Sequence, residues 1–253
     1  LRTLRYGGFY AARARPGLRV ISMHTTILCD MDYYTALNLT IYDVSGQIPW
    51  VNDTLRQARE LGEKVIFIGH TRPTGWMQPF QDAFFPMFQA YSDIIVGYLY
   101  GHAHSAPLNL MRDAVTEKPF AVSYTAGSIT TYQDLNPGFR QWDYNRTDNE
   151  LTGWGEYWMN LTDANLHPDE APEWPLRYHA PEDFNMTSLS PDQWADFANR
   201  LLVEPELFEL WTAAYFKGGP RIFKRGAQEA ADEILDLPSN KSASATQGHG
   251  HRH

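Results

Sequence analysis

The chain has only one cysteine, Cys29, among its 253 residues, so no disulfide can form within it. It also lacks an excess of basic residues: 21 Lys and Arg stand against 30 Asp and Glu, for a formal net charge of −9. Nucleic acids are bound by surplus Lys and Arg, so no nucleic-acid partner is expected, and an anionic membrane surface is disfavoured for the same reason. No stretch approaches the roughly twenty apolar residues that a membrane span needs.

Hydrophobic residues make up 43% of the chain and aromatic residues 14%, which predicts a packed core in one domain or in a large part of one. Short apolar runs alternate with segments of helical periodicity, and this alternation predicts an α/β fold. We expect strands over 17–24, 64–68, 94–100, 119–125 and 154–161, and helices over 47–62, 84–91, 190–217 and 225–237. The residues after 238 are of low complexity and predict a disordered tail.

The strand expected over 94–100 runs directly into Gly101-His102-Ala103-His104. The glycine permits a tight turn, and the residue between the two histidines lets their imidazoles diverge toward two adjacent metal ions. A His-x-His pair on its own is also compatible with two surface loop histidines.

A second apolar strand, 64–68, ends in Gly69-His70 about one crossover unit earlier in the chain. Ligand sites in open α/β sheets gather outside the carboxyl ends of the strands. We therefore expect His70, His102 and His104 to share one crevice as metal ligands. His24 also ends a strand, but we favour a hydrogen-bonded loop histidine there. Arg72 could face a phosphate, but a solvated loop arginine is the favoured interpretation.

Asparagines in Asn-x-Ser/Thr sequons are more frequent than chance predicts. Eleven asparagines and 29 Ser and Thr would give roughly one such sequon by chance. The chain has six, at Asn38, Asn52, Asn145, Asn160, Asn185 and Asn240. The excess predicts a glycosylated protein of the secretory pathway, either secreted or lysosomal/vacuolar, with coincidental sequons as the alternative.

The order Gly-His, then Gly-His-x-His, resembles the last two metal-binding motifs of the calcineurin-like metallophosphoesterases. Four further stretches, 1–10, 127–132, 135–140 and 160–165, resemble the acid sphingomyelinases and their secreted phosphodiesterase relatives. The resemblance extends from the first residue to about Gly219.

The resemblance implies a fold and a division of the chain. Residues 1–165 would form the C-terminal half of a metallophosphoesterase catalytic domain, which is a β-sandwich flanked by helices. Residues 166–238 would form a helical subdomain, and 239–253 the disordered tail.

The resemblance also implies an activity, the hydrolysis of a phosphodiester such as sphingomyelin to ceramide and phosphocholine at a site with two zinc ions. His70 and His102 would ligate one ion and His104 the other. The Asp-x-His, Gly-Asp and Gly-Asn-His motifs of the family do not occur in the chain. We therefore expect them upstream of Leu1, in a missing N-terminal half of the domain, and expect the segment alone to be inactive.

Within the stretch 126–140, Tyr132 and Asn136 are the residues we expect to line the substrate pocket, with a purely structural turn as the alternative. The implied partner is a phospholipid or another phosphodiester, with peripheral membrane contact. In the sphingomyelinases a cysteine comparable to Cys29 pairs with one just after the Gly-His motif, where this chain has Gly75-Trp76. We expect Cys29 to be buried and inert, or else bonded to a segment outside this chain.

Two other functions remain open at this point. The chain could be a phosphoesterase-like domain that is catalytically incomplete and serves as a binding or interaction module. It could also be an unrelated α/β protein with structural histidines, although the order of several motifs over most of the chain argues against this.

Overall fold

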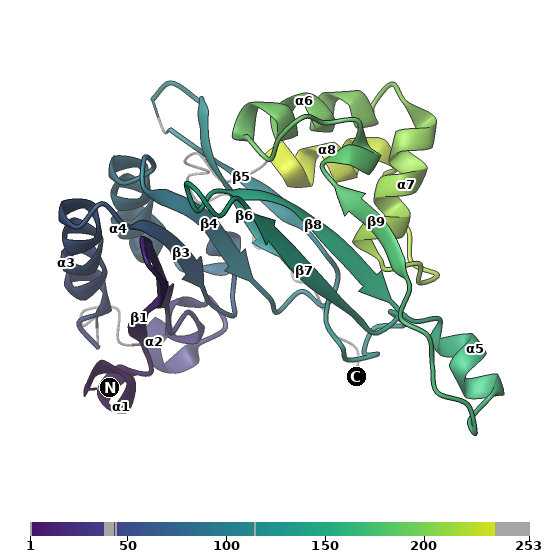
Figure 1. Cartoon of the computed structure of the whole chain (residues 1–253), viewed down its shortest axis with the longest axis horizontal. Coiled ribbons are helices and arrows are strands. Elements are labelled where there is room, and N and C mark those ends of the chain that lie inside the picture. Colours follow the sequence, from purple (N-terminus) through teal and green to yellow (C-terminus); the bar gives the residue numbers. More distant parts are fainter. Residues whose placement is uncertain (1, 38–42, 44, 114, 236–253) are drawn as a thin grey trace.

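The computed structural model describes residues 2–37, 43, 45–113 and 115–235. It contains a six-stranded sheet, a three-stranded sheet and helices packed against both (Figure 1). The strands are β1 Tyr10–Arg15, β2 Leu18–Ser22, β3 Lys64–Ile68, β4 Ile95–Tyr100, β5 Leu108–Arg112, β6 Pro119–Thr125, β7 Gly138–Tyr144, β8 Leu151–Trp158 and β9 Leu176–Ala180. The α-helices are α1 Arg2–Gly7, α2 Tyr33–Leu37, α3 Gln47–Glu60, α4 Gln78–Ala90, α5 Leu161–Leu166, α6 Pro191–Leu201, α7 Pro205–Tyr215 and α8 Ala227–Leu235.

The larger sheet has the order β1-β2-β3-β4-β6-β5. Its four central strands, β2, β3, β4 and β6, run parallel, and antiparallel β1 and β5 form the edges. Helix α3 connects β2 to β3 and helix α4 connects β3 to β4, as parallel neighbours require. The α/β class is therefore confirmed, and the carboxyl ends of the central strands lie at one edge of the sheet.

One hydrophobic core lies between this sheet and helices α3 and α4, which lie together on the left of Figure 1. Phe80, Phe84 and Phe88, spaced four residues apart, form a buried stripe along α4. The helix begins at Gln78, six residues before the expected start at 84. Pro79 occupies its first turn, where proline is tolerated because the N–H of that turn has no partner in the helix.

A second core joins the smaller sheet, of order β7-β8-β9, to helices α6, α7 and α8 and to strands β5 and β6. Aromatic rings dominate it, and Trp194 is fully buried, with its indole N–H donating to the Tyr124 hydroxyl at 3.0 Å. The core also encloses an ion pair, Arg140 to Glu156 at 2.6 Å, with the guanidinium stacked 4.3 Å from the centre of the Trp154 ring. The pairing offsets part of the cost of burying these charges, since Glu156 Oε1 has no hydrogen-bond partner among the described residues.

Several boundaries differ from those expected. The strands over 64–68 and 119–125 are confirmed, whereas the strand expected over 154–161 spans Leu151–Trp158. It ends early because the Asn160 side chain accepts from the Asp163 N–H and starts helix α5. Strand β9 lies beyond the expected division at residue 165 and pairs with β8.

Strands β1, β5, β7 and β9 were not expected. They contain no valine, isoleucine or threonine, so the β-branched part of the strand signal is absent from all four, although β7 carries three aromatic residues. Pairing with a neighbouring strand, rather than local propensity, sets their conformation. The expected tail, 239–253, lies outside the described residues. Within those residues, no helix has both the length and the apolar composition needed to cross a bilayer.

His179 of β9 bridges carboxylates on two other segments. Its Nε2 lies 2.7 Å from Oδ2 of Asp143 in β7, and its Nδ1 lies 2.7 Å from Oε2 of Glu182. The hydrogen bond with Glu182, assisted by that with Asp143, raises the pKa of His179. The same contact lowers the pKa of Glu182. Only the protonated imidazole donates from both nitrogens, so protonation completes the bridge.

Replacing this histidine, His179→Gln, is expected to destabilise the protein mainly in mildly acidic solution. The pKa of His179 is raised above its ordinary 6.5, so its contribution is complete below that pH and is lost as the pH rises through the folded-state value. The lowered pKa of Glu182 makes its contribution complete above its ordinary 4.5 and lost in stronger acid. Urea unfolding of both proteins at about pH 5.5 and about pH 9 measures the change.

The matched control is His167→Gln, which removes an exposed histidine just after helix α5 that has one carboxylate partner, Asp163 at 3.5 Å, in place of two at 2.7 Å. It is expected to change stability less than His179→Gln does at about pH 5.5. A stability difference between His179→Gln and the unaltered protein that is equal at both pH values would contradict the interpretation.

Candidate functional site

The parallel pairing of β3 and β4 brings the two Gly-His loops together. The ladder runs to Ile68 opposite Leu99, and it continues past the strand ends because the Gly101 N–H donates to the His70 carbonyl at 2.9 Å. A Cβ at Gly69 would lie 2.6 Å from Cγ2 of Thr25, in the segment after β2, and 3.0 Å from Cε1 of Tyr100 in β4, so glycine suits this crowded position. His70 and His102 therefore emerge from neighbouring strands at the same edge of the sheet, as expected.

The two imidazoles meet. Nε2 of His70 lies 3.2 Å from Nδ1 of His102, and the ring centroids are 5.0 Å apart in an edge-to-face arrangement. Burial lowers the pKa of His102, and the neighbouring His70, His104 and Arg72 lower it further. This favours the neutral imidazole, which is the form that ligates metal ions.

His104 lies beside this pair in a different environment. Its ring is 5.5 Å from the Tyr132 ring, edge to face, and Tyr132 is 65% exposed. Its Nδ1 is buried and has no hydrogen-bond partner among the described residues. The backbones of His102 and His104 have φ angles of 73° and 62°, a left-handed conformation that costs energy in residues other than glycine.

The histidine pair fits one metal ion in part. Two nitrogens bound to one tetrahedral zinc at about 2.0–2.1 Å lie roughly 3.3 Å apart, close to the 3.2 Å separation of His70 Nε2 and His102 Nδ1. In the part of the chain that the structure describes, however, no group of three His, Cys, Asp or Glu side chains is arranged to hold a metal ion. Two imidazoles are thus in place, and the remaining ligands would have to come from elsewhere.

His24 follows β2 at the same edge of the sheet but does not join the pair. Its ring nitrogen Nδ1 lies 3.0 Å from the Gly7 carbonyl, and its main-chain N–H donates to Oε1 of Gln47 at 2.8 Å. It is the hydrogen-bonded loop histidine that the sequence favoured.

Arg72 is not the solvated loop arginine that we favoured from sequence. Its side chain is partly buried, and Nη2 lies 3.2 Å from Oε1 of Glu233 in helix α8. The Tyr215 hydroxyl donates to the same carboxylate at 2.8 Å. Sequence alone could not show this pairing, because Glu233 lies 161 residues further along the chain.

Cys29 is buried and free, as expected, and burial raises the pKa of its thiol. It forms an isolated β-bridge with Trp76, in the Gly75-Trp76 stretch where the resemblance placed a partner cysteine. The Trp76 side chain is itself buried, and its indole N–H donates to the Thr71 carbonyl at 2.9 Å.

Asn136 has a structural environment. Its Nδ2 donates to the Lys217 carbonyl at 2.9 Å, and its Oδ1 accepts from the Leu161 N–H at 3.0 Å. The amide thus connects the loop before β7 to the end of helix α7 and to the start of helix α5. This supports the structural alternative for Asn136, whereas Tyr132 lies against His104 and is open to solvent.

Four sequon asparagines lie in the described residues, and all four are exposed: Asn52, Asn145, Asn160 and Asn185. Exposure is what glycan attachment requires. Asn38 and Asn240 lie outside the described residues, and glycosylation itself stays a prediction.

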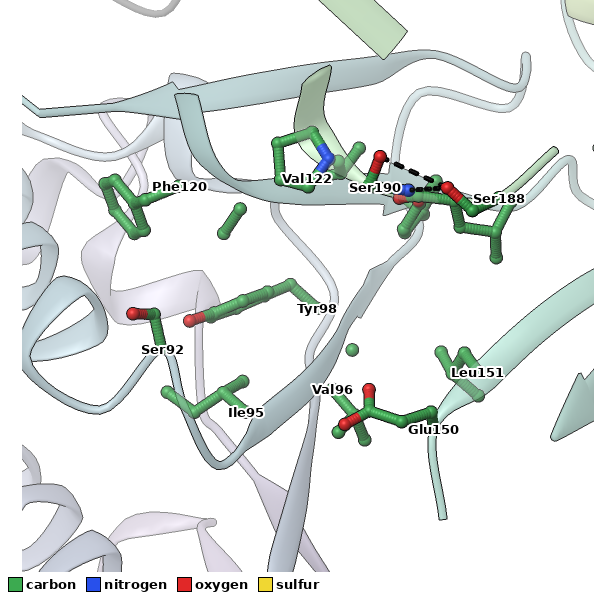
Figure 2. Close-up of a pocket in the computed structure, with 15 residues that line it drawn as sticks. Ser92, Ile95, Val96, Tyr98, Phe120, Val122, Glu150, Leu151, Ser188 and Ser190 are labelled. Atoms are coloured by element: carbon green, nitrogen blue, oxygen red, sulfur yellow. Dashed lines mark hydrogen bonds between the residues drawn. The ribbon is translucent and has the colours of Figure 1, made fainter. Parts of the chain in front are cut away.

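A cavity of about 330 Å³ lies between the N-terminal parts of β4 and β6, away from the carboxyl edge that carries the histidines (Figure 2). The two strands pair only from Tyr98 opposite Ser123 onward. Figure 2 shows Ser188 and Ser190 hydrogen-bonded to each other. The Glu150 carboxylate accepts a hydrogen bond from Nζ of Lys64 at 2.7 Å. The cavity is also lined by Tyr98, whose buried hydroxyl has no hydrogen-bond partner among the described residues. The described residues that line the cavity bring no two ring nitrogens together, so the histidine pair is the better candidate for metal chemistry.

Two residues near the histidines, Ser128 and Lys217, were not named as site residues from the sequence, although Ser128 lies within the stretch 126–140. The Ser128 N–H donates to the His104 carbonyl at 3.3 Å, and Lys217 reaches the Ser128 carbonyl from the end of helix α7. In sequence, a lysine there is typical of a helix C-terminus and does not indicate burial.

Comparisons with known proteins agree with the resemblance. A family model described as "Acid sphingomyelin phosphodiesterase C-terminal region" matches residues 119–217. The sphingomyelin phosphodiesterase of Bos taurus is 34% identical over 225 residues, covering 87% of this chain and 36% of the relative. That of Homo sapiens is 32% identical, with 87% and 35% coverage.

A human cyclic GMP-AMP phosphodiesterase is 29% identical, over 79% of this chain and 47% of its own length. The chain thus spans about a third to a half of the length of these relatives.

The substitution Asn136→Ala is expected to lower the free energy of unfolding by about 1–3 kcal/mol, because it leaves a main-chain donor and a main-chain acceptor without their partner. Tyr132→Ala, in the same loop, is expected to change stability by less than about 0.5 kcal/mol, because the ring is mostly exposed. Urea unfolding of both variants measures the difference. Equal stabilities would show that the Asn136 amide does not brace the loop.

Proposed function

The chain belongs to the acid sphingomyelinase-like family, and on this premise we propose that it supplies the histidine-bearing part of a metal-dependent phosphodiesterase centre. The observation that carries the proposal is the meeting of His70 and His102, with 3.2 Å between two ring nitrogens, at the carboxyl edge of a parallel sheet. Sites of this kind are where open α/β sheets bind ligands.

Zinc is the proposed metal, and a pair of zinc ions would supply a basic water and positive charge against the non-bridging phosphate oxygens. The contribution of this chain is to present ligands. His70 and His102 would hold one ion through the nitrogens that face each other. His104, with its buried and unpartnered Nδ1, would hold the second. The Tyr132 ring packs against His104 and limits its rotation.

The remaining ligands are proposed to come from sequence motifs outside this chain, in an N-terminal half of the same domain. The proposed reaction is hydrolysis of sphingomyelin to ceramide and phosphocholine, and the names of the bovine and human relatives support this substrate. The exposed sequon asparagines support a secreted or lysosomal/vacuolar location, where the protein would meet its lipid at a membrane surface. A binding module without catalysis is the alternative that the experiments below would reveal.

In the product of the complete reading frame, His104→Ala is expected to lower phosphodiesterase turnover at least about a hundredfold while the fold remains intact. Loss of a direct ligand should exceed the 10–100-fold effect of outer-shell residues. Turnover of sphingomyelin, of cyclic GMP-AMP and of a soluble chromogenic diester would be measured for each variant.

The matched control is His24→Ala, a histidine at the same sheet edge whose ring nitrogen Nδ1 lies 3.0 Å from the Gly7 carbonyl. It should retain activity. Full activity of His104→Ala on all substrates would refute its role. Activity on cyclic GMP-AMP or the soluble diester but not on sphingomyelin would keep the phosphodiesterase and reject the lipid substrate. Inactivity of the unaltered protein on every substrate would favour the binding module.

Zinc affinity gives a test that does not depend on turnover. Titration of the metal-free complete protein with zinc against a chromophoric chelator is expected to show at least about tenfold weaker binding for His70→Ala and for His102→Ala. His24→Ala should bind as the unaltered protein does. Unchanged affinity in both His70→Ala and His102→Ala would exclude the pair as ligands.

A further inference from the structure

Lys217 is a buried lysine that connects the helical part of the protein to the histidine loops. It follows helix α7 with a left-handed φ of 52°, and its side chain is fully buried. The stem passes through a slot between two glycines at the ends of the loop before β7. A Cβ at Gly127 would lie 2.5 Å from Cδ of Lys217, and one at Gly138 would lie 3.1 Å from the same atom.

The slot leads the ammonium group to one acceptor. Nζ of Lys217 donates to the Ser128 carbonyl at 2.7 Å, and the Gly138 N–H donates to the same oxygen at 2.9 Å. Burial lowers the pKa of Lys217 to about 8, so the group is charged in neutral and acidic solution. A hydrogen bond from a charged donor is roughly twice as strong as a neutral one.

Ser128 in turn holds the strained end of the histidine motif. Its N–H donates to the His104 carbonyl at 3.3 Å, and its Oγ lies 3.5 Å from the same oxygen. A left-handed backbone such as that of His104 persists only where the surroundings fix it. Four residues beyond Ser128, the same loop places the Tyr132 ring against the His104 imidazole.

We propose that Lys217 is a positioning residue for His104: its ammonium group fixes Ser128, and Ser128 fixes the backbone and the orientation of the histidine. The assignment rests on the proposed function for its catalytic consequence, but the mechanical coupling stands on the contacts themselves. A lysine that served only stability would be a poor choice here, because burying a charge costs energy that an apolar side chain of similar length would not.

A substitution of Lys217 can distinguish a role in positioning His104 from a role in stability alone. Lys217→Met in the complete protein keeps most of the stem and removes the charged donor, while the Ser128 carbonyl keeps its bond from Gly138. The matched control is Lys64→Met at the start of β3, where Nζ also donates to a main-chain carbonyl, that of Asp93 at 3.0 Å, at the other end of the sheet. Urea unfolding, turnover and amide hydrogen exchange would be compared.

Lys217→Met is expected to unfold at a urea concentration no lower than Lys64→Met, to lose about tenfold or more in turnover, and to exchange faster at residues 101–105 and 126–130. Lys64→Met should keep both turnover and the exchange rates of these residues. Unchanged exchange at 101–105, or turnover within about twofold of the unaltered protein, would overturn the proposal.

The measurements distinguish failure of the proposed phosphodiesterase function from failure of the coupling between Lys217 and His104. If the unaltered protein hydrolyses no phosphodiester but exchange at 101–105 still rises in Lys217→Met, the proposed function is wrong and the coupling stands. If Lys217→Met does not fold, Gly127→Ala serves instead, because its methyl group displaces the lysine stem without removing the charge. Gly127→Ala is expected to show the same faster exchange, and unchanged exchange in it would likewise overturn the proposal.

Discussion

The parallel pairing of β3 and β4 is the constraint on which the rest of the site depends. It sets the two strands in register up to Ile68 and Leu99, and the bond from Gly101 to the His70 carbonyl extends this register into the loops. Because both strands end at one edge, two histidines that lie 32 residues apart in sequence come within 3.2 Å. A shift in register of one residue would separate them, since neighbouring residues of a strand face opposite sides of the sheet.

The two cores hold this pairing from opposite faces. Helices α3 and α4 pack on one face of the six-stranded sheet, and the smaller sheet with helices α6, α7 and α8 packs on strands β5 and β6 (Figure 1). Two residues at the ends of helices in the second core also contact the loops of the site. Glu233 of α8 forms an ion pair with Arg72 in the loop after His70, and Lys217, after α7, donates a hydrogen bond to the Ser128 carbonyl. The histidine edge is therefore braced by the C-terminal third of the described chain.

The sequence was informative where a local pattern coincides with a buried element. The apolar run over 64–68 and the glycine before His70 predicted a strand and a loop at their observed positions, and the same reasoning located β4 and its two histidines. Strands such as β5 and β9, which contain no β-branched residue, escaped notice because pairing and burial define them. Asn136 and Arg72 were misjudged or left open for a related reason: their partners lie 25 to 161 residues away, and hydrogen bonds at such separations have no local signature.

Backbone strain and an unpartnered buried nitrogen occur together at the histidine motif. Two successive histidines of a His-x-His sequence have left-handed backbones, each at a cost of order 1–3 kcal/mol, and a buried unpartnered nitrogen adds a cost of similar size. A loop that was free to relax would lose both the left-handed backbone conformation and the unpartnered buried nitrogen. Here the His104 carbonyl is held by Ser128, and Ser128 is held by an ammonium group on a stem enclosed between two glycines. The stability of two packed cores thus keeps the His104 backbone in a left-handed conformation that the loop alone would not adopt.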